Sequence, residues 1–99
     1  MKTTVHKIQK MSLQKFATRY NLHMDVTERD RPKGSPDRYY ASFRNVEVKD
    51  GCILSSPYGN GAMPAKAIAD YAPQLSNKII VIDAMRESRR EVTTPVVTP

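Results

Sequence analysis

The sequence predicts an α+β fold, in which an antiparallel sheet of three to four strands carries its helices on one face, in the order α-β-β-β-α-β. Apolar residues recur at helical spacing near the N-terminus and again in the second half of the chain. Between these two stripes, residues 22–56 mostly alternate apolar and polar side chains and contain a hairpin signal. A short apolar run at residues 79–82 follows the second stripe. This succession of helical and strand periods indicates the α+β class.

The first helix is predicted over residues 12–20. Its buried face consists of Leu13, Phe16, Ala17 and Tyr20. Ser12 is a suitable N-cap, because its hydroxyl can accept a hydrogen bond from a first-turn N–H, and Asn21 can end the helix in the left-handed conformation. A half-buried strand is expected next, since apolar residues alternate with polar ones at Leu22, Met24 and Val26.

An exposed loop and a long strand are predicted in the middle of the chain. Residues 28–37 hold two prolines, one glycine and six charged residues, which is typical of an exposed loop. Residues 38–49 form the longest predicted strand, and a change of phase around Arg44-Asn45 indicates a bulge. Asp50-Gly51 is typical of a type I′ hairpin turn that leads to a partner strand near residues 52–56.

The second helix is expected to follow a tight turn made by Gly59-Asn60-Gly61. Pro64 suits the first helical position, where its missing N–H costs nothing. The apolar stripe of this helix consists of Ala65, Ile68, Ala72 and Leu75. Pro73 is expected to end or kink the helix. A turn at Ser76-Asn77 and a buried strand over residues 78–83 complete the predicted order.

The chain is long enough for one domain with a thin core. It has 99 residues, of which 39% are hydrophobic, and no tryptophan. We divide it into a basic N-terminal segment (residues 1–11), a single α+β domain (12–83) and a charged, mostly extended C-terminal tail (84–99). An open edge beside the last strand leaves a homodimer as one possible assembly.

Positive charge is concentrated at the N-terminus. Sixteen Lys and Arg against ten Asp and Glu give a net charge of +6, and residues 1–20 contain five of these cations and no carboxylate. A basic surface favours polyanions such as nucleic acid, although this charge also serves solubility alone. The predicted nucleic-acid contacts are Lys7, Lys10, Lys15 and Arg19, with Lys66 at the start of the second helix as a further contact.

Two more binding candidates follow from the loops. Successive N–H groups of Gly59, Asn60 and Gly61, placed before a helix N-terminus, form a candidate anion-binding turn. The simpler interpretation of that turn is a strand-to-helix connection. The exposed loop offers a protein-contact site, whose cations are diluted by neighbouring carboxylates, at Arg29, Arg31, Lys33 and Arg38.

No catalytic residue, metal site or cofactor is predicted. His6, His23 and Cys52 are isolated and lack the spacing of metal ligands. A single cysteine excludes an internal disulfide and fits a reducing cytoplasm. No stretch approaches the roughly 18 apolar residues of a membrane span. We therefore expect a non-enzymatic cytoplasmic protein, with no membrane partner.

Residues 12–75 resemble a double-stranded-RNA-binding domain in the order of their elements. The likeness is carried by Leu13-Gln14-Lys15-Phe16, by the strand at residues 39–48, and by Gly59-Asn60-Gly61 before an Ala-rich helix. The resemblance implies contacts to RNA phosphates. That family opens its second helix with a cluster of lysines, whereas this chain has Lys66 there.

Two other resemblances bear on the biological setting. Residues 39–82 are similar to HicB-type antitoxins, whose strands lead to a G-x-T-x-x-E-A helix, and residues 61–67 keep its spacing without its Thr and Glu. The whole chain looks like small bacteriophage and prophage proteins with a Tyr-Gly-Asn-Gly turn, a Pro-starting helix and a VIDA-like strand. The likeness to phage proteins implies a viral accessory role in the cytoplasm of a host cell, including interference with a host system.

Three hypotheses follow. The first is a phage-type accessory protein that binds nucleic acid, DNA or RNA, through its basic N-terminal face. The second is a protein-binding module, such as an inhibitor of a host defence (anti-CRISPR-like) or nuclease complex, or an antitoxin-like partner, that uses the exposed loop and the tail. The third, an enzyme acting on a small anionic substrate at the Gly-x-Gly turn, lacks any identified catalytic residue.

Overall fold

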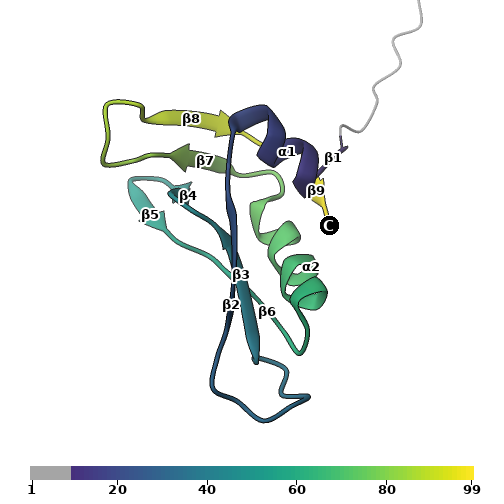
Figure 1. Cartoon of the computed structure of the whole chain (residues 1–99). Coiled ribbons are helices and arrows are strands. Elements are labelled where there is room, and N and C mark those ends of the chain that lie inside the picture. The colour runs from purple at the N-terminus through teal and green to yellow at the C-terminus, as the bar shows by residue number, and fades with distance from the viewer. Residues whose placement is uncertain (1–9) are drawn as a thin grey trace, which may run out of the picture.

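The computed structural model describes residues 10–99 and confirms the α+β class (Figure 1). This range contains two helices, α1 (Leu13–Tyr20) and α2 (Pro64–Leu75), and nine short strands. The strands are β1 (Lys10–Ser12), β2 (Met24–Glu28), β3 (Tyr39–Phe43), β4 (Val46–Asp50), β5 (Ile53–Ser55), β6 (Gly59–Gly61), β7 (Ile79–Ile82), β8 (Arg90–Thr93) and β9 (Val96–Thr98).

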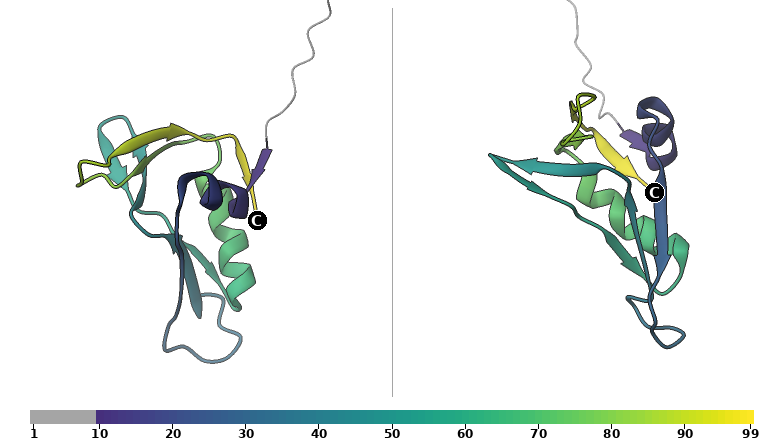
Figure 2. Two further views of the ribbon diagram at one scale, coloured as in Figure 1. Left: turned by 45° about the horizontal axis from the view of Figure 1, so that its top comes forward. Right: turned by 60° about the vertical axis from the view of Figure 1, so that its left-hand side comes forward.

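The strands form two antiparallel sheets and one parallel pair. The sheets have the orders β2-β3-β6 and β5-β4-β7-β8, and β1 pairs with β9 in parallel. Figure 2 shows β4 and β5 leading away from the line of β2 and β3, while α2 runs alongside β6. Residues 90–98, which the sequence assigns to a tail, form β8 and β9, and Val97 is buried in the core.

Helix α1 has the caps that its sequence predicts. The Ser12 hydroxyl accepts a hydrogen bond from the Lys15 N–H at 3.1 Å. At the other end, Asn21 adopts a left-handed φ of 54°, and the Leu22 N–H donates to the Ala17 carbonyl at 2.8 Å. Both signals are local, so they could be found from the sequence.

Helix α2 corrects two expectations. Pro64 begins the helix as predicted, but the helix continues through Pro73 to Leu75. Pro73 lies in the last turn and is exposed, so water can solvate the carbonyl that loses its N–H partner, and the turn is held by burying Leu75. The buried face also differs from the predicted one. Ala65 is exposed, whereas Ala67 and Tyr71 are fully buried.

The long predicted strand is in fact two strands in different sheets. Residues 44–45 separate β3 from β4, and Asn45 has a left-handed φ of 60°. The Arg44 N–H donates to the His23 carbonyl, and the Asn45 carbonyl accepts from the Asp83 N–H, both at 2.9 Å. The change of phase therefore marks a switch between sheets and not a bulge.

The β4–β5 hairpin lies one residue further along than predicted. Asp50 pairs with Ile53, so the central turn residues are Gly51 and Cys52. Gly51 has a φ of 63°, whereas Cys52 is not in the left-handed region. One left-handed residue at the first central position is the pattern of a type II′ turn, for which glycine is preferred, and not of the predicted type I′ turn.

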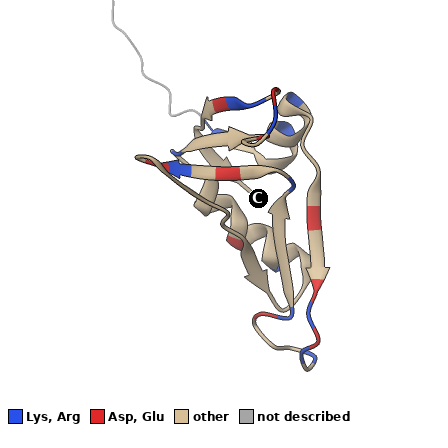
Figure 3. Cartoon of the chain, turned by 90° about the vertical axis from the view of Figure 1, so that its left-hand side faces the viewer, with Lys and Arg blue, Asp and Glu red and all other residues tan. Residues whose placement is uncertain are grey.

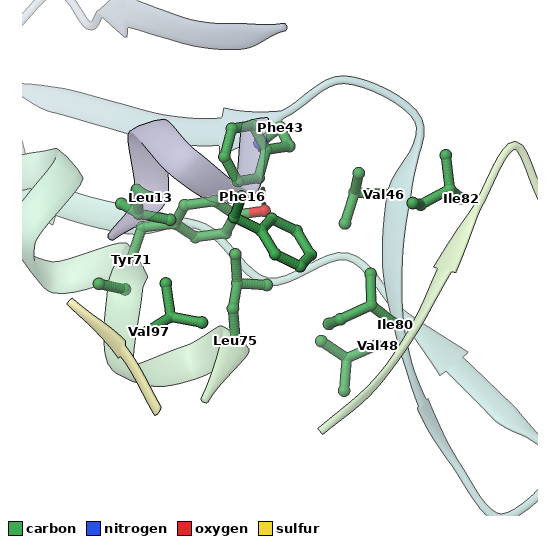
Figure 4. Packing of buried hydrophobic residues seen from close by; sticks show 11 residues of the cluster. Leu13, Phe16, Phe43, Val46, Val48, Tyr71, Leu75, Ile80, Ile82 and Val97 are labelled. Carbon is green, nitrogen blue, oxygen red and sulfur yellow. Dashed lines mark hydrogen bonds between the residues drawn. The ribbon is translucent and has the colours of Figure 1, made fainter. Parts of the chain in front are cut away.

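The core lies where α1, α2 and the two antiparallel sheets meet (Figure 4). The Phe43 ring lies 5.9 Å from the Phe16 ring and 5.7 Å from the Tyr71 ring, measured between centroids. The Tyr71 hydroxyl accepts a hydrogen bond from the Phe43 N–H at 3.1 Å. Ala72, Leu75 and Ile80 are also fully buried in this cluster.

Candidate binding surfaces

The Gly59-Asn60-Gly61 segment is strand β6 and not a tight turn. Gly59 pairs with Ala41 and Gly61 pairs with Tyr39 on β3, and neither glycine has a positive φ. A Cβ at Gly59 would lie 2.8 Å from the Tyr71 Cα. The glycines therefore allow the backbones of β6 and α2 to touch, which is a different use of glycine from the predicted turn.

The backbone N–H of Asn60, at the centre of this segment, already has a hydrogen-bond acceptor within the protein. The Asn60 N–H donates to Asp70 Oδ2 at 2.8 Å, and Asn60 Oδ1 accepts from Arg29 Nη1 at 2.7 Å. The amide of the predicted anion-binding turn thus holds a carboxylate of the protein itself. The edge of β6 is further closed by Gln74, whose side-chain amide donates to the Tyr58 carbonyl.

Arg29 braces the base of the exposed loop. Its Nη1 also donates to the Asp37 carbonyl at 2.7 Å. Its guanidinium carbon lies 4.4 Å from the centre of the Tyr40 ring and 5.6 Å from that of Tyr58. Hydrogen bonds and rings surround this cation, so it is a structural part of the loop rather than an exposed contact.

Two of the other loop cations are paired with carboxylates. Arg38 Nη2 lies 2.8 Å from Glu28 Oε1, and this hydrogen bond raises the pKa of the Arg38 guanidinium because it favours the charged form. Arg31 Nε lies 3.4 Å from Asp37 Oδ2. Lys33 is the one predicted loop cation that is exposed and makes neither an ion pair nor a side-chain hydrogen bond within residues 10–99.

A hollow of about 440 Å³ brings Lys66 together with loop cations. We call it the loop hollow; its lining residues are Lys33, Gly34, Arg38, Tyr39, Ala62, Met63, Pro64 and Lys66. The sequence placed Lys66 with the N-terminal cations instead. Pairing of β3 with β6 places the start of α2 beside the end of the loop, and nothing local to these residues indicates that contact.

The predicted N-terminal cations are exposed on α1 and β1. We call Lys10, Lys15 and Arg19 the α1 basic face; Lys7 lies outside the described residues. Within residues 10–99 none of the three pairs with a carboxylate. A shallow hollow of about 620 Å³ beside them is lined by Met11, Ser12, Gln14, Lys15, Thr18 and Arg19. Gln14 was not predicted as a binding residue. Its position one helical turn before Thr18 places the two residues on the same exposed side of α1, and this spacing could have indicated it.

Three further cations are paired with carboxylates. Arg44 Nη2 lies 2.8 Å from Asp25 Oδ1, and Lys49 Nζ lies 2.9 Å from Glu91 Oε1, with Arg89 at 3.4 Å from the same oxygen. Hydrogen bonds from Arg44 and Lys49 lower the pKa of the Asp25 and Glu91 carboxyls, because they stabilise the charged forms. Figure 3 shows both signs of charge side by side on these strands and on the loop.

The α1 basic face and the loop hollow lie at opposite ends of the molecule. Helix α2 starts at the loop hollow and runs toward α1 (Figures 1 and 2). Its 12 residues make it about 18 Å long. Lys66 therefore does not extend the α1 basic face, and within residues 10–99 the loop hollow is a basic surface separate from it.

Comparison of the chain with protein-family models, with curated protein sequences and with solved structures gives no match. The double-stranded-RNA-binding, HicB and phage resemblances therefore stay hypotheses that rest on the sequence motifs. Among residues 10–99, neither helix has the length and apolar character needed to cross a membrane.

Proposed function

We propose that this chain is a non-enzymatic, phage-type accessory protein that binds nucleic acid through the α1 basic face. The observation that carries the proposal is a contrast in charge pairing. Lys10, Lys15 and Arg19 are exposed and have no carboxylate partner within residues 10–99, whereas five cations elsewhere are held in ion pairs: Arg31, Arg38, Arg44, Lys49 and Arg89. Unpaired cations are available to replace the counterions of a phosphate backbone.

The chemistry of the α1 basic face favours contacts to phosphates over contacts to bases. Lys15 and Arg19 lie one helical turn apart, so their side chains project from the same side of α1. The Gln14 amide lies beside them and can donate to a phosphate oxygen. Contacts of this kind position a protein on a duplex but read little sequence. We therefore expect binding that depends on salt and only weakly on sequence.

The salt dependence of binding tests this proposal. Three cations on the α1 basic face predict that log K falls against log salt with a slope of about −2.7 or steeper for duplex DNA. The variant Lys15→Ala/Arg19→Ala should bring the slope about 1.8 closer to zero. Fluorescence anisotropy with labelled duplex DNA, duplex RNA and single-stranded DNA, titrated at several salt concentrations, measures these slopes and the preferred form.

A matched control separates a local site from net charge. Lys78→Ala/Arg86→Ala removes the same two charges from exposed residues that form no ion pair within residues 10–99. It should keep the wild-type slope. Equal slopes for the two double variants, or no binding by the wild-type chain even at low salt, would reject the α1 basic face as the contact surface.

We propose a protein-binding module as the second candidate function, such as an inhibitor of a host defence or nuclease complex or an antitoxin-like partner. The observation that favours it is the exposed loop, which extends from the end of the molecule opposite α1 (Figure 1). Arg29 holds the base of this loop in place from within, so the loop can present side chains in a fixed arrangement. A discrete partner protein that is lost on replacement of residues 30–36 would support this function.

A further inference from the structure

The loop hollow has an excess of positive charge. Lys33, Arg38 and Lys66 line it, and no carboxylate does. Glu28 neutralises Arg38 from the side, so the net charge comes from Lys33 and Lys66. The first turn of α2 contains no acidic residue, and its N-cap, Met63, offers no side-chain acceptor. The positive end of the helix therefore adds to the field instead of being cancelled.

The loop hollow also has an apolar part. Tyr39, Ala62, Met63 and Pro64 make up half of the residues that line it. Met63 is 59% exposed, and the flexible thioether of methionine adapts to different apolar partners.

The loop that forms one wall is held by its own hydrogen bonds. The Arg38 N–H donates to the Ser35 carbonyl and the Ser35 N–H donates to the Pro32 carbonyl, each at 3.1 Å. The Arg29 N–H closes the base of the loop by donating to the Arg38 carbonyl at 2.6 Å. A wall that is ordered before binding reduces the entropy that a partner has to overcome.

Charge and apolar contact together select one kind of occupant. A phosphate backbone satisfies the cations but offers little to Met63 and Pro64. A peptide that carries carboxylates beside an apolar side chain satisfies both. The volume of about 440 Å³ lies in the range of sites that take a small ligand or a few side chains.

We propose that the loop hollow binds an acidic segment of a partner protein. An apolar side chain of that segment lies against Met63, and flanking carboxylates pair with Lys33 and Lys66. The proposal rests on the second candidate function and names the chemistry of its partner. It is independent of nucleic-acid binding at the α1 basic face.

Selection from a random peptide library displayed on phage, with the full chain immobilised, tests the proposal. The selected peptides should be enriched in Asp and Glu beside a large apolar residue. The strongest one, synthesised with a fluorescent label, should bind the variant Lys33→Glu/Lys66→Glu at least about tenfold more weakly than the wild-type chain. The Met63→Ser variant should also bind more weakly, because it loses the apolar contact.

A second double variant provides the matched control. Lys10→Glu/Lys15→Glu makes the same change of charge on the α1 basic face and should bind the peptide within about twofold of wild type. This control variant should no longer bind duplex DNA, whereas Lys33→Glu/Lys66→Glu should still bind it. Circular dichroism and thermal unfolding confirm that each variant is folded.

Three results would overturn the inference. The library could yield no acidic and apolar motif. The two double variants could reduce the affinity for the peptide equally, which would show that the attraction depends only on net charge. Lys33→Glu/Lys66→Glu could lose the binding of duplex DNA and keep the binding of the peptide, which would make the loop hollow a nucleic-acid site. Because each double variant is tested against both ligands, failure of this inference is distinguishable from failure of the α1 basic face.

Discussion

Replacing Gly59 by alanine puts a methyl group where the backbone of α2 already lies. The added Cβ would be 2.8 Å from the Tyr71 Cα and nearer still to the Tyr71 N and the Ala67 O. Gly59 is buried between β3 and α2, so the methyl group cannot turn toward solvent. Strand or helix must move before the side chain fits.

The size of the effect follows from this geometry. Ordinary carbon–carbon contacts are about 3.5–4.0 Å, so α2 has to shift by about 1 Å away from β6. That shift loosens Tyr71 and Leu75, which are both fully buried in the core. Overfilling a packed site usually costs about 1–3 kcal/mol, and backbone atoms cannot rotate away as a side chain can. We expect Gly59→Ala to cost about 3 kcal/mol or more.

Urea unfolding followed by far-UV circular dichroism measures the loss. Gly34→Ala is the control: Gly34 has a φ of 87° and no atom within 4 Å of its added Cβ. This control should lose only about 1–2 kcal/mol, through left-handed backbone strain. A Gly59→Ala variant as stable as Gly34→Ala would refute the close contact between β6 and α2.

Two further predictions concern the buried tyrosine. Tyr71→Phe leaves the Phe43 N–H without its acceptor and should cost about 1–3 kcal/mol in urea unfolding, whereas Tyr58→Phe, at an exposed ring, should change the free energy of unfolding by about 0.5 kcal/mol at most. Equal losses in the two variants would contradict the hydrogen bond. Burial raises the pKa of Tyr71 from 10.0 to about 12. The folded chain therefore binds more protons than the unfolded chain between these values, and its stability should fall by about 2–3 kcal/mol as the pH rises through this window. The Tyr71→Phe variant should lack this component, so parallel stability curves for the two proteins above pH 10 would show the shift to be absent.

Features of the fold that depend on neighbours in the sequence could be predicted. The Ser12 cap, the left-handed Asn21 and the start of α2 at Pro64 each involve residues within one turn of one another. The structure of residues 90–98 could not be predicted in the same way. Val92 pairs with Ile80, and Val97 pairs with Met11, so both contacts depend on distant parts of the chain.

Glycine and proline mark the points where local interpretation fails. A Gly-x-Gly segment is compatible with positive φ and equally with close approach of two backbones, and only the position of α2 decides between them for Gly59 and Gly61. Pro73 illustrates the same limit. Its local cost favours a break, but burial of Ala72 and Leu75 keeps the last turn helical.

The two basic surfaces differ in how far the sequence indicates them. Lys15 and Arg19 share a side of α1 by their spacing alone, so they could be placed together before the structure was known. The loop hollow depends on pairing between β3 and β6, which brings Lys33 and Lys66 together across the fold. The ion pair of Arg38 with Glu28 likewise depends on the register of β2 and β3.

The parallel pairing of β1 with β9 has a consequence for the order in which the chain folds. Lys10 lies opposite Val96, so this pair closes a loop that contains almost the whole described chain. Such a closure costs about 4 kcal/mol of chain entropy, and each strand contributes only three residues to repay it. The pair is therefore expected to form after the central core has assembled. Lys10 lies in this closing strand and Ser12, its last residue, caps α1. A ligand that contacts both β1 and α1 would therefore stabilise the β1–β9 pair and, with it, the completed fold.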